Sequence, residues 1–231
     1  HRLSCKYGRT RMSFLLFVII AHFQTVFQDF FVNRAAPKNR LAVLCKVWYH
    51  NDKRKQEHET MKITIRPAAP ADAQRCAEIH IRSWDAAYTG RIPQECIERA
   101  RARRPSLWST IIPTANNQSH YVIADGDTGE IAGFFVIEPA RDADLPASVL
   151  ELTSLYLDPA FLRRGLGRAA VQWIRTAAAE RYFDTVSTWV LIGNAEAQAF
   201  YRACGFSPDG AVKPSGLGDT TVERLLLTVG C

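Results

Sequence analysis

A strand that leads through a glycine-rich turn into a long amphipathic helix is the feature that most constrains this chain of 231 residues. Residues 149–158 (VLELTSLYLD) have the composition of a central strand, and Pro159 ends it. The turn is RRGLG at 163–167, and the helix after it carries one apolar face at Leu166, Ala170, Ile174 and Ala177. This order of elements indicates a sheet with helices packed against it.

The glycine-rich turn has the chemistry of an anion site. Free N–H groups at a helix start point at one spot, and the helix dipole adds positive potential there. Gly165 and Gly167 allow close approach of the backbone, since a Cβ would collide with phosphate oxygens. Arg163, Arg164 and Arg168 add charge at the same place. These features suit a diphosphate, although a turn of this kind taken alone is as often a simple helix cap.

The other periodicities complete an α/β fold built on a mixed sheet. Three strands and two helices come before the central strand, and a strand, a helix and closing strands come after its helix. This order predicts helices on both faces of the sheet. The expected elements are strands at 61–66, 121–125, 130–138 and 185–192, helices at 72–88, 93–104 and from Asn194 to the stop at Gly205, and closing strands at Phe206 and 222–229.

The positive charge of the chain is confined to its first 60 residues. The whole chain has a net charge of +6, yet residues 1–60 hold 11 Lys or Arg against 4 Asp or Glu, and the remainder holds 18 against 19. A nucleic-acid-binding domain carries its basic excess on the folded part. Since residues 61–231 lack that excess, we expect no nucleic-acid partner.

Residues 1–60 have the character of a leader. The chain begins with His1, and Met61 opens a clean strand-like segment. We therefore expect 1–60 to be a disordered or non-native upstream extension and 61–231 to be the domain. The apolar run Met12 to Phe23 has 12 residues, too few to span a bilayer, and its signal-peptide cleavage pattern is poor. We expect no membrane partner, with a membrane anchor as the alternative.

The cysteines and histidines are dispersed along the chain. Cysteines at 5, 45, 76, 96, 204 and 231 form no CxxC pair, and the six histidines form no HxH or HxxxH. Scattered thiols are typical of a reduced, cytosolic protein. No paired spacing suits a structural metal, so we expect no metal site.

Three segments resemble the GNAT superfamily of acetyl-CoA-dependent N-acetyltransferases. LYLDPAFLRRGLGRAAV (155–171) is similar to the acetyl-CoA-binding motif, in which the turn has Gln/Arg-x-x-Gly-x-Gly/Ala. TWVLIGNAEAQAFYRACGF (188–206) is similar to the second family block, and AAYTGRIP (86–93) is typical of one branch. The resemblance covers nearly all of 61–231. It implies a twisted, mostly antiparallel sheet with a V-shaped splay at the acetyl-CoA site.

The resemblance implies acetyl-CoA as co-substrate and no metal. In the family, backbone N–H groups of the central strand hold the pantetheine arm, the turn holds the diphosphate, and an amide contacts the coenzyme arm. The matching residues are Leu155, Tyr156 and Leu157 on the strand, Arg163, Arg164, Gly165, Leu166, Gly167 and Arg168 in the turn, and Asn194, which is also a good helix cap. Leu162 departs from the first motif position, and Arg163 could replace the missing side-chain contact. Because acetyl-CoA is an intracellular metabolite, a cytoplasmic location follows.

The resemblance also implies direct transfer of acetyl to an amine. An N–H group among residues 155–157 would act as an oxyanion donor. Glu151 lies upstream on the same strand, where several family members place a general base, and burial there would raise its proton affinity. A surface Glu at the strand start, or a water-relayed base elsewhere, is the alternative. Tyr201 matches the family tyrosine that protonates the leaving thiolate, and a core aromatic is its alternative role.

The acceptor side is less defined. Trp84 and Tyr88 lie at i and i+4, so they share a helix face and are candidates for a wall of the acceptor site, or for core packing. Glu138, Asp142 and Asp144 could attract a cationic amine or belong to a solvated loop. We expect a primary amine of a small molecule or peptide as substrate.

The sequence leaves a competing function and the oligomeric state undecided. A non-catalytic acyl-CoA-binding sensor or interaction module is the competing function, although such a binder needs neither Glu151 nor Tyr201. Homodimers are common among family members, but the sequence carries no specific signal for one.

Overall fold

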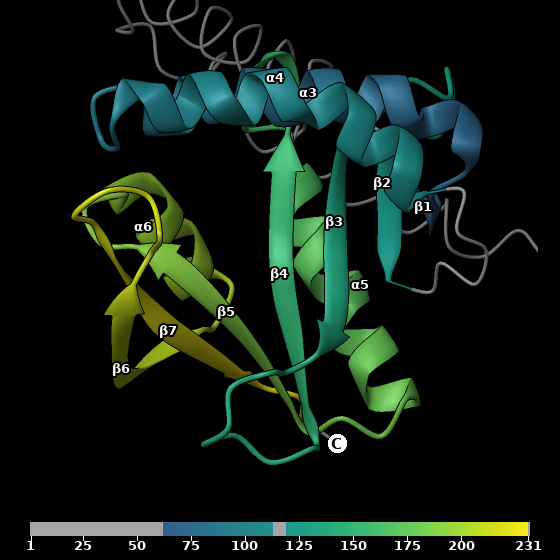
Figure 1. The fold of residues 1–231 in the computed structure, drawn as a ribbon. Coiled ribbons are helices and arrows are strands. Elements are labelled where there is room, and N and C mark those ends of the chain that lie inside the picture. The colour runs from purple at the N-terminus through teal and green to yellow at the C-terminus, as the bar shows by residue number, and fades with distance from the viewer. Residues whose placement is uncertain (1–61, 113–118, 231) are drawn as a thin grey trace, which may run out of the picture. The chain divides into compact units, whose positions relative to one another are not determined.

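The computed structural model describes residues 62–112 and 119–230, and these residues form a seven-stranded sheet in the order β1-β2-β3-β4-β5-β7-β6 (Figure 1). The expected leader, residues 1–60, lies outside the described residues, as does Met61. The strands are β1 (Ile63–Pro67), β2 (His120–Asp125), β3 (Ile131–Pro139), β4 (Val149–Leu157), β5 (Thr185–Leu191), β6 (Ser207–Pro214) and β7 (Thr221–Thr228). The helices are α3 (Ala73–Tyr88), α4 (Gln94–Ile111), α5 (Leu166–Glu180) and α6 (Ala195–Ala203), with short 3-10 turns η1 (Pro70–Asp72) and η2 (Pro159–Phe161).

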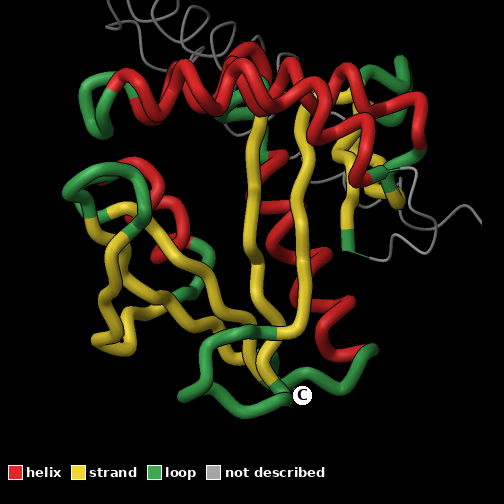
Figure 2. The backbone as a smooth tube through the Cα atoms, viewed as in Figure 1, coloured by secondary structure: helices red, strands yellow, loops and turns green. Residues whose placement is uncertain are grey.

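Helices cover both faces of the sheet, as the alternation of its apolar residues requires. On one face, Tyr121, Ile123 and Phe135 pack with α5 in the main core. On the other, Val122 and Phe134 pack with α3 and α4. Figure 2 shows the paired helices α3 and α4 on one side of the strands and α5 on the other. The mixed α/β fold with helices on both faces is confirmed.

The sheet opens between β4 and β5. Every other neighbouring pair is antiparallel, but β4 and β5 run parallel and pair only at Val149, Leu150 and Glu151. Beyond Glu151 the two strands diverge, β4 staying with β3 and β5 with β7. The divergence is visible in Figure 1 as a V between β4 and β5, and it confirms the expected splay.

A β-bulge in β4 lies just beyond the last β4–β5 pair, where the two strands begin to diverge. Val136 pairs with Ser154 while Ile137 pairs with Leu152, so Thr153 is the extra residue. The bulge shifts the alternation by one position: Leu150 and Leu152 face α5 before it, and Leu155 and Leu157 face α5 after it. Tyr156 consequently points to the α3–α4 face.

Helix α4 is longer than expected. Its periodicity predicted an end at Arg104, because Pro105 follows and cannot donate a backbone hydrogen bond. The helix instead continues to Ile111 with Pro105 inside it. Trp108 and Ile112 lie one and two turns further on and are buried against α3 and Phe134, so packing of the last turns outweighs the loss at the proline.

The sheet ends with a strand that the sequence did not predict. Only Phe206 and residues 222–229 were expected to close the sheet, and the structure adds β6, an edge strand with Pro208, Gly210 and Pro214, whose composition is unusual for a strand. Among the described residues, no helix is long and apolar enough to cross a membrane. Within the same residues no cluster of three His, Cys, Asp or Glu side chains could hold a metal ion.

Candidate active site

The splay leaves one edge of β4 without a partner strand. The Asp158 N–H donates to the Ala132 carbonyl of β3 at 2.8 Å, so the pair Asp158–Ala132 is a hydrogen-bonded one. Hydrogen-bonded pairs alternate along an antiparallel ladder, so Leu155 and Leu157 direct their N–H and C=O groups away from β3. That direction is the splay. The side chains of both leucines pack in the core, and their backbones are what they offer to a ligand.

The glycine-rich turn begins α5 beside this edge. Gly165 is the N-cap with φ +83°, and a Cβ placed there would meet no atom within 4 Å. The first intrahelical bond runs from the Ala169 N–H to the Gly165 carbonyl at 3.0 Å, so the N–H groups of Leu166, Gly167 and Arg168 have no helical acceptor. The turn therefore offers open space above a set of free donors, which is what a diphosphate requires.

Side chains of the turn divide into exposed cations and buried spacers. Arg163, Arg164 and Arg168 are exposed, and Arg163 takes φ +63°. Leu166 is buried at 1% exposure, so it can contribute only its N–H. Gly167 is also buried, and a Cβ there would lie 3.0 Å from the ring of Phe200 and 3.6 Å from Leu157. The contact with α6 thus explains the glycine at 167. The expected reason, close approach of a phosphate, is not the one that the structure shows for this residue.

Tyr201 enters the splay from α6. It is buried beside Phe200 and Phe206, and burial raises the pKa of its phenol well above the usual value, while a hydrogen bond with the Thr188 side chain acts in the opposite direction. Thr188 of β5 donates in turn to the Leu152 carbonyl of β4 at 2.9 Å. Thr188 therefore bridges the two diverging strands just beyond their last pair, on the side from which Tyr201 approaches.

Glu151 occupies the apex of the V. It belongs to the last β4–β5 pair, opposite Ser187, and is 9% exposed. Its neighbours Leu150 and Leu152 face α5, so Glu151 faces the opposite side of the sheet, the side of α3 and α4. Glu151 and Tyr201 therefore reach the splay from different elements, a strand and a helix.

Asn194 acts as the N-cap of α6. Its Oδ1 accepts a hydrogen bond from the Ala197 N–H at 3.2 Å, and the residue is 7% exposed. Capping uses the amide oxygen, which leaves the NH₂ group for other contacts.

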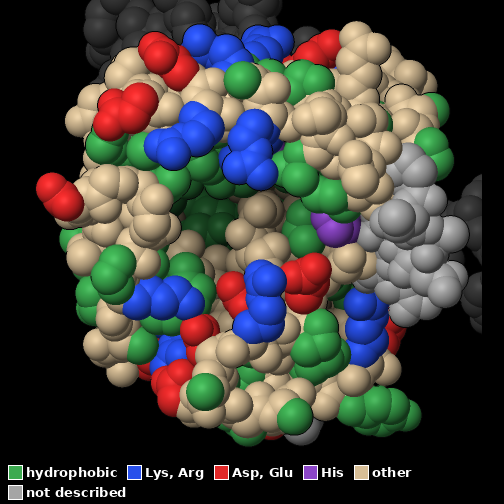
Figure 3. Space-filling view, viewed as in Figure 1, with side chains coloured by type: hydrophobic (Ala, Val, Ile, Leu, Met, Phe, Trp, Pro, Cys, Tyr) green, Lys and Arg blue, Asp and Glu red, His purple; other side chains and the backbone are tan. Residues whose placement is uncertain are grey.

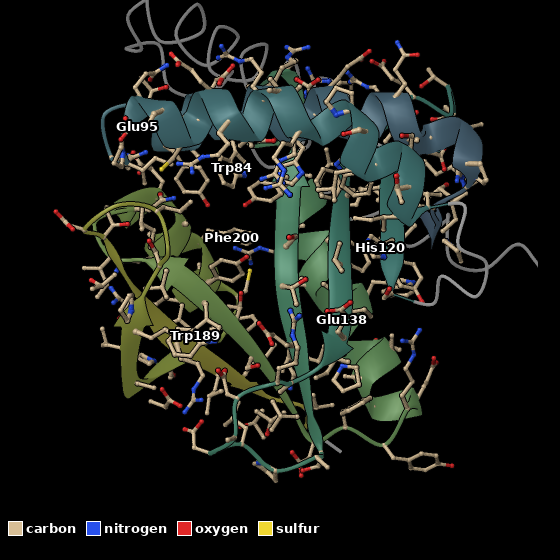
Figure 4. The ribbon with its side chains drawn as sticks, viewed as in Figure 1. Trp84, Glu95, His120, Glu138, Trp189 and Phe200 are labelled. Carbon is tan, nitrogen blue, oxygen red and sulfur yellow. The ribbon has the colours of Figure 1, made fainter. Side chains whose placement is uncertain are left out.

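A stack of aromatic side chains lines the α3 side of the site. The Tyr88 and Tyr156 hydroxyl oxygens lie 3.5 Å apart, and Trp84 packs edge-on against Tyr88 with ring centroids 5.1 Å apart. His80 stacks on Tyr156 at 4.7 Å and accepts from the Trp108 indole N–H at 3.2 Å. Figure 4 shows Trp84 pointing from the helical layer toward the sheet. Trp84 and Tyr88 thus lie beside the strand that carries the backbone donors.

The sequence profile described as the acetyltransferase (GNAT) family matches residues 75–206. The chain belongs to this family. The match runs from α3 to the end of α6, so it includes the turn, the splay and both candidate catalytic residues. The expected family and the expectation of an acyltransferase are confirmed.

Several solved structures share the fold of this chain. PaiA N-acetyltransferase from Thermoplasma acidophilum, in complex with coenzyme A, is 21% identical with a TM-score of 0.56, over 71% of this chain and 98% of that one. Apo YjaB from Escherichia coli is 23% identical with a TM-score of 0.52, over 72% and 97%. Ard1 from Thermoplasma volcanium is 21% identical with a TM-score of 0.52, over 73% and 99%. No sequence among the curated proteins matches this chain.

The acidic residues ahead of β4 have a structural use in this GNAT domain. Arg224 is 4% exposed and donates to both carboxylate oxygens of Asp144 and to Asp209 at 2.7 Å. Asp142 accepts from Lys213 at 2.8 Å and from the Trp189 indole at 2.8 Å. These aspartates therefore tie the loop after β3 to β6 and β7. The Asp144 side chain is still 63% exposed, as a solvated loop predicts, and Glu138 pairs with Arg141 at 3.4 Å; attraction of a cationic amine by Glu138, Asp142 and Asp144 stays a prediction.

Sequence reasoning missed two parts of the site. Thr188 was quoted only as part of a motif, because a threonine on a strand carries no signal of what it bridges. The expected helix at 93–104 contains several arginines, but which of them face the site depends on how α4 lies on the sheet. The glycine-rich stretch Gly216-Leu217-Gly218 is a loop between β6 and β7.

Proposed function

We propose that the domain transfers an acetyl group from acetyl-CoA to a primary amine of a small molecule or peptide. The observation that carries the proposal is the short β4–β5 pairing. It leaves the N–H groups of Leu155 and Leu157 facing an opening that has the α5 turn at one end and Tyr201 on its α6 side. These residues fit acetyl-CoA, a long thioester with a diphosphate at its far end. The thioester supplies the activated acetyl group.

Each part of the opening has a task in the proposed reaction. The free N–H groups of Leu166, Gly167 and Arg168 bind the diphosphate, with Arg163 and Arg164 adding charge. The Leu157 N–H orients the coenzyme arm, and the Leu155 N–H donates to the oxygen on which negative charge develops. Asn194 offers its NH₂ group to the arm.

Proton transfer is divided between two side chains. Glu151, at the apex and on the α3–α4 side, accepts the proton that the amine must lose, directly or through water. Tyr201 donates a proton to the departing thiolate. A phenol of ordinary pKa is already protonated at neutral pH, and burial, which raises the pKa of Tyr201, keeps the proton in place until the thiolate forms.

Thiol release from acetyl-CoA over a panel of amines tests the proposal. Tyr201→Phe removes only the hydroxyl, and a loss in kcat on the order of 10²-fold is expected for a general acid. Tyr182→Phe is the matched control, because Tyr182 is 94% exposed and lies after α5. Glu151→Gln should lower the rate, because an amide cannot accept the proton of the amine.

The outcomes separate the alternatives. Unchanged kcat in Tyr201→Phe would remove that residue from the mechanism. Tight binding of acetyl-CoA without turnover on any amine would contradict catalysis and favour the acyl-CoA-binding module.

We also propose that residues 61–231 suffice for activity, and that the protein works in the cytoplasm, where acetyl-CoA is made available. Deletion of residues 1–60 should leave kcat and KM unchanged. A deleted chain that binds acetyl-CoA but loses turnover would show that the leader contributes to the site.

A further inference from the structure

A cavity of about 370 Å³ lies under α4, beside the aromatic stack. Trp84 of α3 and the loop residues Gly216 and Leu217 form two of its sides, and the rest is α4. Trp84 joins the cavity to Tyr88 and, through the tyrosine hydroxyl pair, to Tyr156 on β4. Trp84 therefore belongs both to the cavity wall and to the aromatic stack that reaches β4. The size of the cavity suits a small molecule.

The cavity carries positive charge without compensation. Arg99, Arg103 and Arg104 line it, and no Asp or Glu does. Nearby arginines are paired, since Arg101 meets Asp85 at 2.8 Å and Arg91 meets Glu196 at 2.7 Å. Within residues 62–112 and 119–230, none of the three lining arginines has an acidic partner. Figure 3 shows Lys and Arg side chains along the α4 rim of a hollow with an apolar floor.

Two buried donors in the cavity wall lack an acceptor. The Arg104 Nε and the Trp84 Nε1 are both buried without a hydrogen-bond partner in the described structure. The Arg104 guanidinium lies over the Trp84 ring at 4.6 Å, so the two donors are adjacent. Buried donors are nearly always paired in folded proteins, and an unpaired one is destabilising. Burial and the charge of Arg103 lower the pKa of Arg104. An anion bound in the cavity would raise that pKa again.

The cavity also lies on the correct side of the sheet for an acceptor. Helix α5, whose N-terminal turn is the proposed diphosphate site, packs on the face opposite to α3 and α4. The acceptor and the coenzyme diphosphate would then approach from opposite faces and meet at the splay. The cavity arginines are for this reason not a second site for the diphosphate.

We propose that this cavity binds the anionic group of the acceptor, so that the preferred substrates are small amines that also carry a carboxylate or a phosphorus oxyanion. Arg104 and Trp84 donate to the anion, and Arg99 and Arg103 add charge at the rim. Arginine forks suit both kinds of oxyanion. The inference rests on the proposed acetyl transfer, and it specifies the acceptor class.

The test is a matched panel of amines with the full chain and acetyl-CoA. Methionine, methioninamide and 3-(methylthio)propylamine share a side chain and differ in the anionic group, and 3-aminopropylphosphonate adds the phosphorus oxyanion. We expect kcat/KM for the anionic amines to exceed that for the neutral-tailed ones by roughly 10- to 100-fold, the range of a charged hydrogen bond. A better rate with methioninamide or with the decarboxylated amine would overturn the inference.

The variants locate the effect. Arg104→Met keeps an unbranched chain over Trp84, and it should raise KM for the anionic amines at least roughly tenfold more than KM for the neutral amines. Arg103→Met, at the exposed rim, should give a smaller effect in the same direction. Arg101→Met is the control on the same helix and should change neither. An anion preference that survives in Arg104→Met would also overturn the inference.

A binding readout keeps the inference separate from the proposed function. Calorimetric titration with 3-aminopropylphosphonate needs no turnover. Binding that Arg104→Met abolishes, in a protein that acetylates nothing, would refute the proposed function and retain the cavity. Acetylation of neutral amines at the best rates, with no binding of the phosphonate, would retain the proposed function and refute the inference.

Discussion

The strongest prediction concerns the Cβ that Gly165 lacks. Gly165 has φ +83°, which L residues rarely adopt, and the space where its Cβ would lie is open. Two separate consequences follow from adding a side chain there. The backbone conformation becomes strained, and an atom enters the space proposed for the diphosphate.

The two consequences have different magnitudes in different variants. Gly165→Ala should destabilise the fold by about 1–2 kcal/mol, the cost of a left-handed residue with a Cβ. For a domain of this size that is about 2 to 8 °C in Tm. Gly165→Asn should cost clearly less, because Asn tolerates this region. Both add the same Cβ, so both should weaken acetyl-CoA binding alike, by at least roughly tenfold, or about 1.4 kcal/mol.

Gly129 provides the control. It lies in the β2–β3 hairpin with φ +74° and with no atom within 4 Å of its Cβ position. Gly129→Ala should therefore reproduce the loss of Tm and leave acetyl-CoA binding unchanged. Thermal unfolding and calorimetry measure the two quantities on each variant. Folded Gly165 variants that bind acetyl-CoA as tightly as the wild type would refute the assignment of the turn, and equal stability of all variants would refute the backbone argument.

Three further predictions use the surroundings of the site. Thr188→Val keeps the shape but leaves the Leu152 carbonyl unpaired, so the free energy of unfolding should fall by about 1–2 kcal/mol in chemical denaturation. Burial, with the charge of Arg104, lowers the pKa of His80 from 6.5 to about 3, so between these pH values the unfolded chain binds one more proton than the folded one. The free energy of unfolding should therefore fall by about 1.4 kcal/mol per pH unit as the pH drops from 6 to 4.5. His80→Phe should remove that part of the pH dependence. The hydrogen bond from Arg224 holds the pKa of Asp144 below its ordinary 3.8. The ion pair therefore stabilises the fold fully above pH 3.8, and this stabilisation is lost as the pH falls through the lower pKa of the folded state. Arg224→Met should lower Tm at pH 7, and the Tm values of variant and wild type should converge in acid.

Local patterns predicted most of the fold because they agree with the tertiary packing. The helix at 72–88 and the strand at 149–158 were expected within a residue or two of α3 and β4. The failures came where packing outweighed local preference. Pro105 argued for the end of a helix that the burial of Trp108 extends, and β6 forms in spite of its prolines because β7 offers an edge.

The site was predictable in its motif and less so in its geometry. The glycine-rich turn identified the start of α5, but a sequence does not reveal that Phe200 packs on Gly167. Strict alternation along β4 would put Ser154 and Tyr156 on the face of Leu152. The bulge at Thr153 reverses that, and nothing in the residue types of VLELTSLYL indicates it.

The same bulge connects the two halves of the proposed reaction. Because it follows the last β4–β5 pair by two residues, the strand changes face just where it loses its neighbour. From that point Leu155 and Leu157 turn their side chains to α5 and their backbone donors to the splay, and Tyr156 turns toward Tyr88 and the arginine-lined cavity. In the proposed reaction, the one strand would therefore serve the coenzyme through its backbone and the acceptor through the Tyr156 side chain. Without the bulge, Ser154 and Tyr156 would take the place of Leu155 and Leu157 in directing N–H groups to the splay, and the Tyr156 side chain would face α5.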